Sequence, residues 1–317
     1  MSSLDRELDE IFADLPEFQL NGDSIEILKS PGEFYENLLK LIRNAKRRII
    51  LCSLYLGDDE LTLKLIDEIS SVLEQKPDLQ LKMLIDFNRS TRKNDNCLKN
   101  LKNLMRNFGS DRVQIAFFHT PLLRNWRKNF FPSRWNEIFG VQHMKLYIFD
   151  DDLLISGANL SESYFTNRQD RYFLLKFCPL LTEFYQQIVD VFSQFSFKLG
   201  QSNDGNLEIL ENSAVHPFEG DFRFFTSRLK KKVGQILENH KNSILIVEQD
   251  TKISPIIQMG VCGLEDENLI LEKLFELKSK VNWRIASGYF NLTQKYQDLL
   301  LQNFDQNRIS ILTASPG

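Results

Sequence analysis

Apolar runs typical of buried strands alternate along this chain with amphipathic patterns typical of helices, and this alternation restricts the fold more than any other feature. In the first half the predicted strands cover residues 24–29, 49–56, 79–86 and 113–118, and the predicted helices cover 32–45, 61–74, 94–108 and 179–197. Alternating strands and helices bury their apolar faces as a sheet with helices packed against it. The sequence therefore predicts an α/β fold.

The same alternation returns in the second half of the chain. Here helices are predicted over 222–239, 269–281 and 294–303, and strands over 243–248, 283–289 and 308–313. The segment Trp283–Phe290 echoes Arg48–Tyr55, and each is followed by a helix and a further apolar strand, which indicates an internal repeat. The turn-rich stretch Lys198–Gly205 is the predicted boundary. We therefore expect an acidic N-terminal extension over 1–17, a first repeat over 18–200 and the start of a second repeat over 201–317.

Composition narrows the classes of function. The 317 residues are 42% hydrophobic, enough for a large core, and their net charge of −4 gives no general attraction to nucleic acid. The four cysteines are far apart in sequence, so we expect reduced thiols, no disulfide framework and no metal site. No apolar stretch reaches the roughly 18–20 residues that span a bilayer, so any membrane contact is expected to be peripheral.

The stretch Gln142–Ser161 contains the main candidate catalytic residues. It reads as a strand, a turn at Asp151 and a second strand. In an extended chain alternate side chains share a face, so the imidazole of His143 and the ammonium of Lys145 face one small pocket. Beyond the second strand, Gly157 permits close approach and Asn159 offers an amide. This arrangement suits an anion that carries a leaving group.

The spacing His-x-Lys, four residues, Asp, six residues, Gly-x-Asn is met by His143, Lys145, Asp150, Gly157 and Asn159, and it resembles the signature of the phospholipase D superfamily. The continuation from Ser156 to Tyr172 resembles one branch, the eukaryotic mitochondrial phosphatidylglycerophosphate synthases. Further matching segments bring the resemblance from about Phe18 to the last residue; they are Ser53–Gly57, Phe118–Leu123 and Ser287–Thr293. The resemblance implies a duplicated phospholipase D-like domain, with a mixed β-sheet flanked by helices on both faces.

The resemblance also implies an activity: transfer of the phosphatidyl group from CDP-diacylglycerol to glycerol 3-phosphate, giving phosphatidylglycerophosphate and CMP for phosphatidylglycerol and cardiolipin synthesis. In this interpretation His143 is the nucleophile that forms a phosphohistidine, Lys145 and Asn159 hold the nonbridging oxygens, and Asp150 orients a histidine. The chemistry requires no metal or other cofactor. The implied location is the mitochondrion, peripheral to the inner membrane, although the acidic first residues do not resemble a transit peptide.

Other segments are weaker candidates for substrate contact. Arg89 and Arg92 follow a predicted strand at a spacing that can clamp a phosphate. Two solvated arginines are equally compatible with the spacing alone, and the family resemblance favours substrate binding. We expect His119 to support or contact the substrate. The resemblance associates Ser53, Tyr55 and Gly57 with ATP, but no phosphate-loop motif is present, and a simple strand-end turn is the stronger interpretation.

The segment Arg124–Trp135 interleaves basic and aromatic residues. Such a segment can rest on an anionic membrane, and it can equally pack on its own domain.

Superfamily members of this type carry a second His-x-Lys motif in the C-terminal half. The register of the repeat places it near position ~370, beyond Gly317, and the remaining histidines lack a lysine two residues on. We therefore expect an incomplete second repeat. Three hypotheses follow: a phosphatidyltransferase, alone or as a homodimer that shares sites; a phosphodiesterase that uses water; or a half-site protein without turnover.

Overall fold

The structure is a computed structural model that describes residues 2–91, 96–124, 140–211, 213–241, 249–277, 281–288, 290–302 and 308–313. The chain forms two compact units. The larger is Phe18–Ile253, and the smaller combines Met1–Glu17 with Ser254–Gly317.

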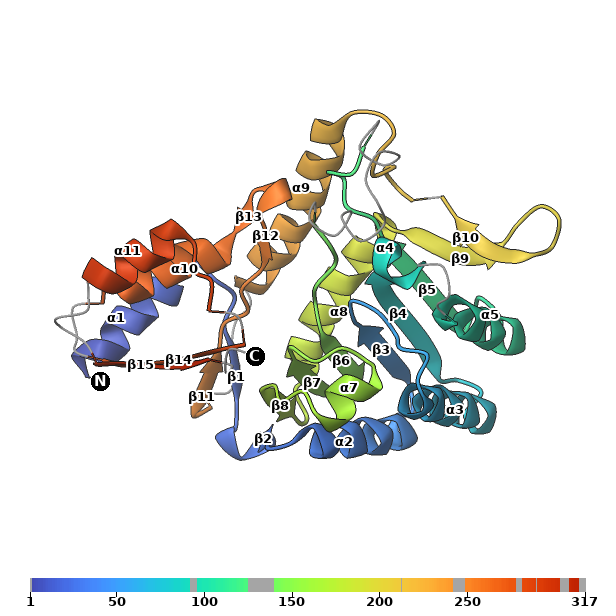
Figure 1. The fold of residues 1–317 in the computed structure, drawn as a ribbon, viewed down its shortest axis with the longest axis horizontal. Helices are drawn as coiled ribbons and strands as arrows, with labels where there is room; N and C mark the ends of the chain where they lie inside the picture. The colour runs from blue at the N-terminus through green and yellow to red at the C-terminus, as the bar shows by residue number, and fades with distance from the viewer. Residues whose placement is uncertain are drawn as a thin grey trace. The chain divides into compact units, whose positions relative to one another are not determined.

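The larger unit is built on a nine-stranded sheet with the order β10-β9-β5-β4-β3-β6-β7-β8-β2 (Figure 1). Its strands are β2 (Ile25–Leu28), β3 (Arg48–Cys52), β4 (Gln80–Asp86), β5 (Val113–Phe118), β6 (Leu146–Phe149), β7 (Asp152–Ser156), β8 (Tyr172–Leu175), β9 (Phe197–Gln201) and β10 (Leu207–Leu210). The central strands β3, β4 and β5 are parallel, and the other neighbouring pairs are antiparallel. The mixed sheet that the sequence predicts is confirmed.

Burial on both faces explains why β3 lies in the middle of the sheet. Its residues Ile49, Ile50, Leu51 and Cys52 are each at most 2% exposed, so this strand has no polar face to give to solvent. An uninterrupted apolar run of this kind is typical of strands that are covered on both sides.

Helices cover both faces of the sheet (Figure 1). One face carries α2 (Pro31–Asn44), α3 (Glu60–Gln75), α5 (Cys97–Phe108) and α7 (Glu162–Thr166), and the other carries α8 (Pro179–Gln194), on which α9 (Phe222–Lys241) packs. Neighbouring residues of β4 show the two sides: Lys82 pairs with Asp190 of α8, whereas Met83 joins the apolar cluster that contains Met105 of α5.

Local signals fix where these helices begin. Ser30 accepts a hydrogen bond from the backbone of Glu33, with Pro31 in the first turn of α2, and Asp59 caps α3 through Thr62. These caps lie within one or two residues of the predicted helix starts.

The β6–β7 hairpin pairs Leu146 with Ile155 and Phe149 with Asp152. The predicted strand, turn and strand are therefore present, but β6 begins at Leu146 rather than at Gln142. At the turn, Asp150 has a φ of 53°, a left-handed conformation that Asp tolerates better than most residues.

The smaller unit contains α1 (Ser3–Phe12), α10 (Asp266–Phe275), α11 (Gln294–Gln302), the short strands β12 (Gln258–Met259) and β13 (Leu264–Glu265), and the strands β14 (Asn282–Ser287) and β15 (Arg308–Thr313). The strands β14 and β15 are parallel, as β3 and β4 are. Helix α1 packs on α10, with Ile11 buried against Ile270 and Leu277.

The two units differ from the division expected at residue 200. The expected boundary Lys198–Gly205 lies in the β9–β10 hairpin, and the larger unit continues to Ile253, where β11 (Thr251–Ile253) pairs with β1 (Phe18–Leu20). The acidic residues 1–17 share a unit with the C-terminal segment. The strand predicted at 243–248 lies outside the described residues.

Candidate active site

The chain segment that carries His143 is anchored to the ends of two central strands. The backbone N–H of Gln142 donates to the buried carboxylate of Asp86, at the end of β4, over 2.9 Å. The side-chain amide of Gln142 reaches the sulfur of Cys52, at the end of β3, also at 2.9 Å. These contacts replace the sheet pairing that the sequence predicts here and leave the side chain of His143 exposed to solvent.

Lys145 lies beside His143 but is almost completely buried, at 5% exposure. Its ammonium donates to the backbone carbonyl of His143 over 2.9 Å, so Lys145 is held next to the backbone of that residue. Burial lowers the pKa of Lys145 to about 8. The side chain of His143 remains accessible, but the protein atoms around it remove part of its hydration, and this desolvation together with the charge of Lys145 lowers the pKa of His143. A histidine that is neutral at neutral pH can act as a nucleophile.

The charge of Asp170 opposes the effect of burial on Lys145. Cys52 would act in the same direction only as a thiolate, and burial raises its pKa far above neutral, so Asp170 is the anion that matters at neutral pH. Asp170 also accepts from the backbone N–H of Gly157 over 3.2 Å. A Cβ on Gly157 would lie 2.5 Å from the carboxylate, so a side chain here would have to displace Asp170 from this position.

Asn159 is fixed by the turn that follows β3. Its side-chain oxygen accepts from the backbone N–H of Leu54 over 3.2 Å, and the residue is 2% exposed. Because that oxygen is held by the backbone, the amide nitrogen of Asn159 is directed away from Leu54. This orientation suits donation to a substrate oxygen.

Ser53, Tyr55 and Gly57 all serve internal contacts. Ser53 is fully buried and donates to the carbonyl of Tyr55, whose phenol contacts the hydroxyl of Ser161 at 3.1 Å. Gly57 donates to the carbonyl of Leu160 over 2.8 Å, and a Cβ there would lie 2.8 Å from that of Ser161. The segment therefore holds the loop that carries Asn159, in keeping with a strand-end turn.

Asp150 lies at the other end of β6 from His143, roughly 20 Å away along an extended chain. Its carboxylate accepts three backbone N–H groups, those of Lys46, Arg47 and Arg48, over 2.8 to 3.0 Å. The structure therefore does not bring Asp150 to His143, and this carboxylate fixes the start of β3 instead.

The other residues predicted to contact the substrate differ in where the structure places them. The guanidinium of Arg89 lies over the ring of Tyr55, 4.5 Å from its centroid, close to the loop of Asn159. His119 is 1% exposed and packs among aromatic rings, including Phe87 and Phe218, so it faces the core. Arg92 and all of the loop Arg124–Trp135 except Arg124 lie outside the described residues.

Two functional candidates, Asp86 and Asp170, were not predicted. Burial raises the pKa of Asp86 to about 6, while the backbone N–H groups of Gln142 and Arg89 oppose that rise. The only sequence signal for Asp86 was its position as the last residue of a buried strand.

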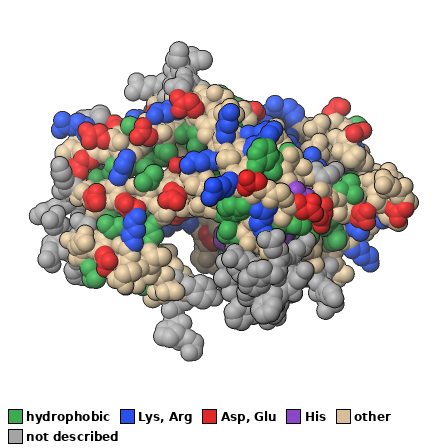
Figure 2. Space-filling model, turned by 90° about the horizontal axis from the view of Figure 1, so that it is seen from above, with side chains coloured by type: hydrophobic (Ala, Val, Ile, Leu, Met, Phe, Trp, Pro, Cys, Tyr) green, Lys and Arg blue, Asp and Glu red, His purple; other side chains and the backbone are tan. Residues whose placement is uncertain are grey.

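Among the described residues, one group of three metal-ligand types lies close together, Glu211, His216 and Glu219. The ring of His216 already has a neighbour at each nitrogen: the backbone N–H of Glu219 donates to Nδ1, and Glu211 lies 3.3 Å from Nε2. The four cysteines are free and buried. Figure 2 shows acidic and basic side chains intermingled on the face it presents, in keeping with the small net charge.

Comparison with known proteins agrees with this geometry. Residues 38–195 match the family described as "Cardiolipin synthase, PLD-like domain". This segment is a phospholipase D-like domain. It contains the whole of the first His-x-Lys motif and most of the nine-stranded sheet.

Full-length relatives extend the similarity. The mitochondrial CDP-diacylglycerol--glycerol-3-phosphate 3-phosphatidyltransferase of Homo sapiens is 35% identical over 95% of this chain and 59% of its own length. The enzymes from Dictyostelium discoideum, described as probable, and Saccharomyces pastorianus are each 33% identical and are covered over 55% and 60% of their lengths. The chain thus spans less than two thirds of these relatives.

A solved structure supports the fold. Phosphatidylserine synthase from Haemophilus influenzae superposes with a TM-score of 0.66 at 22% identity, over 99% of this chain and 66% of that one. None of the described helices has the length and apolar character needed to cross a membrane.

Proposed function

We propose that this chain transfers a phosphatidyl group from CDP-diacylglycerol to glycerol 3-phosphate. The observation that carries the proposal is the pair formed by the exposed His143 and the buried Lys145, beside a loop that presents Asn159. Relatives that are 33 to 35% identical to this chain over the aligned region are named for this reaction.

In the first step a neutral imidazole nitrogen of His143 attacks the phosphorus that bears diacylglycerol. A P–N bond forms, the P–O bond to CMP breaks, and CMP leaves with the electron pair and takes up a proton. Lys145 and the amide nitrogen of Asn159 donate to the nonbridging oxygens, where negative charge must be neutralised. In the second step a hydroxyl of glycerol 3-phosphate loses its proton, attacks the phosphorus and releases His143.

The proposal also covers the location of the reaction, the pairing of chains and the need for cofactors. The names of the animal relatives include the mitochondrion, and we propose that location, with peripheral contact to the anionic inner membrane. We further propose that two chains pair to supply two histidines. The exchange itself requires no metal or organic cofactor, and titration with ATP would test the proposed association at Ser53–Gly57.

The test measures CMP release from CDP-diacylglycerol in mixed micelles, with and without glycerol 3-phosphate, on protein whose oligomeric state is determined in parallel. Wild type is compared with His143→Ala and with His240→Ala, a matched control on α9. Release that needs glycerol 3-phosphate and falls at least about a thousandfold in His143→Ala, but not in His240→Ala, is expected.

The alternatives give different products. Release of CMP with phosphatidic acid, independent of glycerol 3-phosphate, would indicate a phosphodiesterase that uses water. No release in any oligomeric state would identify a half-site protein and contradict the proposal for this chain.

A further inference from the structure

A cavity of about 430 Å³ lies between β5 and β9, where these two strands separate. They pair at only two positions, Ala116 with Lys198 and Phe117 with Phe197, and β9 then continues as a hairpin with β10. The earlier part of β5 therefore borders an opening in the sheet, between α8 on one face and α5 on the other. The volume is in the range of small-molecule sites.

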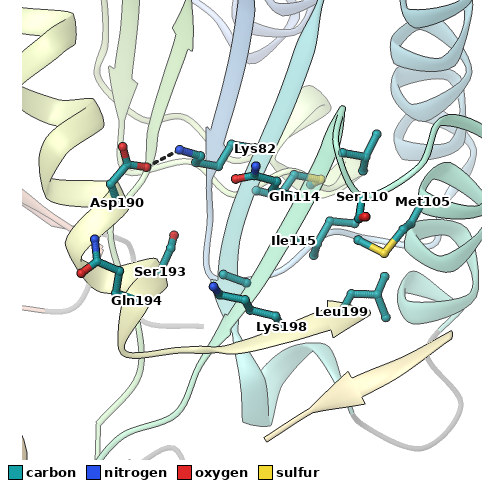
Figure 3. Close-up of a pocket in the computed structure, with 13 residues that line it drawn as sticks. Lys82, Met105, Ser110, Gln114, Ile115, Asp190, Ser193, Gln194, Lys198 and Leu199 are labelled. Atoms are coloured by element: carbon teal, nitrogen blue, oxygen red, sulfur yellow. Dashed lines mark hydrogen bonds and ion pairs between the residues drawn. The ribbon is translucent and has the colours of Figure 1, made fainter. Parts of the chain in front are cut away.

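The wall on the α8 side is polar (Figure 3). Lys82 and Asp190 form an ion pair there and neutralise each other. Lys198 is exposed and forms no ion pair with another described residue, so the wall keeps one uncompensated positive charge. Figure 3 shows Ser193 and Gln194 projecting from α8 on the same side as Asp190.

The same wall also carries the hydroxyl group of Ser193. Its hydroxyl oxygen is buried and has no hydrogen-bond partner among the described residues. Ser70 in α3 and Ser196, just beyond the end of α8, show the usual alternative, because each donates to the carbonyl four residues earlier. A buried hydroxyl without a partner costs free energy, so a ligand that bonded to it would gain in affinity.

The opposite wall is aliphatic. It consists of Met83, Met105, Val113, Ile115 and Leu199, whose flexible or branched side chains fit an unbranched hydrocarbon. The described residues that line the cavity include no aromatic side chain, histidine or arginine, so a nucleotide base would find no partner for stacking.

We propose that this cavity binds a single-chain anionic amphiphile. The anionic head group lies at Lys198 and accepts hydrogen bonds from the hydroxyl of Ser193 and from the amide nitrogen of Gln194, whose oxygen already accepts from Lys232. The aliphatic chain lies along the methionines. The same chemistry is offered by a fatty carboxylate and by a phosphate monoester with one alkyl chain. The cavity shares no residue with the candidate active site, so the proposal is independent of the proposed function.

The five methionines of the chain provide a readout specific to this cavity. In protein labelled with ¹³C at the methionine methyls, decanoate and decyl phosphate are titrated separately, below their micellar concentrations, with decanol as a neutral comparison. The signals of Met83 and Met105 are expected to shift saturably with one or both anions. Met144, next to His143, and Met259, in the smaller unit, are expected to stay unchanged. The anion that binds more tightly identifies the natural head group.

Two variants and a control complete the test. Lys198→Gln is expected to weaken binding of the anion about tenfold and to leave decanol unaffected, because it removes only the charge. Ser193→Leu is expected to abolish binding by filling the cavity, and Lys230→Gln, an exposed lysine of α9, to have no effect. The proposal is overturned if neither anion shifts Met83 and Met105, if Lys198→Gln binds normally, or if Met144 responds first.

Discussion

Lys145 combines deep burial with the need to carry a positive charge. Because burial lowers its pKa to about 8, the Lys145 side chain is charged at neutral pH. It loses its proton, and with it the positive charge, as the pH rises above that value. His143 has the opposite requirement, since a nucleophile must be neutral, and its lowered pKa keeps it neutral down to pH values below the usual histidine range. The pair therefore works in a limited window of pH.

We predict a bell-shaped dependence of CMP release on pH, with a descending limb near pH 8. Lys145→Arg should lower the maximal rate because a guanidinium has a different shape, but it should remove the descending limb because arginine does not titrate in this range. Initial rates from pH 5 to 10, with Lys99→Arg as a surface control, would check this. A descending limb retained in Lys145→Arg would contradict the assignment.

Asp150 belongs to the same motif but acts on the backbone. Its carboxylate accepts from Lys46, Arg47 and Arg48. We predict that Asp150→Ala lowers the free energy of unfolding by about 2–4 kcal/mol, because three N–H groups lose their acceptor. Asp150→Asn, which tolerates the left-handed backbone and keeps one acceptor oxygen, should lose less.

Denaturant unfolding measures this loss, and CMP release per folded molecule separates it from catalysis. Full activity per folded molecule in Asp150→Asn is expected. An activity loss of about a thousandfold with unchanged stability would instead place Asp150 in the chemistry.

The contrast between Asp150 and Asp170 shows what could be predicted at this scale. The motif spacing singled out His143, Lys145 and Asn159, and the β6–β7 hairpin brings the segments that flank it, and that carry these residues, to the same end of the sheet. It did not locate Asp170, which reaches Gly157 only because the chain after α7 returns to β8 beside the hairpin. Such a contact depends on tertiary structure and has no periodic signal.

At the scale of elements, the loop after β7 is held by two glycine contacts and by its hydrogen bonds to the end of β3. Because a Cβ on Gly157 would lie 2.5 Å from the carboxylate of Asp170, any side chain at this position must displace that carboxylate. The contact between this loop and Asp170 therefore depends on the absence of a side chain at residue 157.

We predict that Gly157→Ala destabilises the protein by about 0.5–1.5 kcal/mol and lowers activity, because the Asp170 side chain must move and its hydrogen bond with the backbone N–H of Gly157 is lost. Gly234, in the middle of α9, is the matched control, since a Cβ there meets nothing within 4 Å. Gly234→Ala should be stabilising by roughly 0.5–1 kcal/mol. Thermal unfolding of both variants, with activity, checks the pair, and equal effects would refute the steric argument.

Elements with both a strong apolar run and clear ends were predictable: β5 and β15 have the predicted bounds. The start of β6 was not, because the N–H of Gln142 pairs with a carboxylate from β4 rather than with a neighbouring strand. Sequence periodicity cannot distinguish these two partners.

At the scale of the whole molecule, the main core is contained in one unit. The apolar cluster from Leu28 to Leu199 includes no residue of the smaller unit. The boundary expected near residue 200 could not be found from sequence, because the turn-rich segment proved to be a hairpin rather than a linker.

We predict that residues 18–253 alone fold into a stable protein with cooperative unfolding, because they contain the complete sheet and its helices on both faces. Thermal and urea unfolding of this fragment, followed by circular dichroism and by fluorescence, should coincide. Non-coincident transitions, or a fragment without tertiary structure, would show that the smaller unit is required.

The smaller unit joins the two ends of the chain, and this has a consequence for biosynthesis. Helix α1 leaves the ribosome well before α10, because Ile270 and Leu277, which bury its Ile11, are made more than two hundred residues later. At about 5–20 residues per second, that delay lasts roughly 10–50 seconds. Over that interval the capping box at Ser2 and the helix's own hydrogen bonds support α1, so this helix is synthesised long before its partner α10 is available for packing.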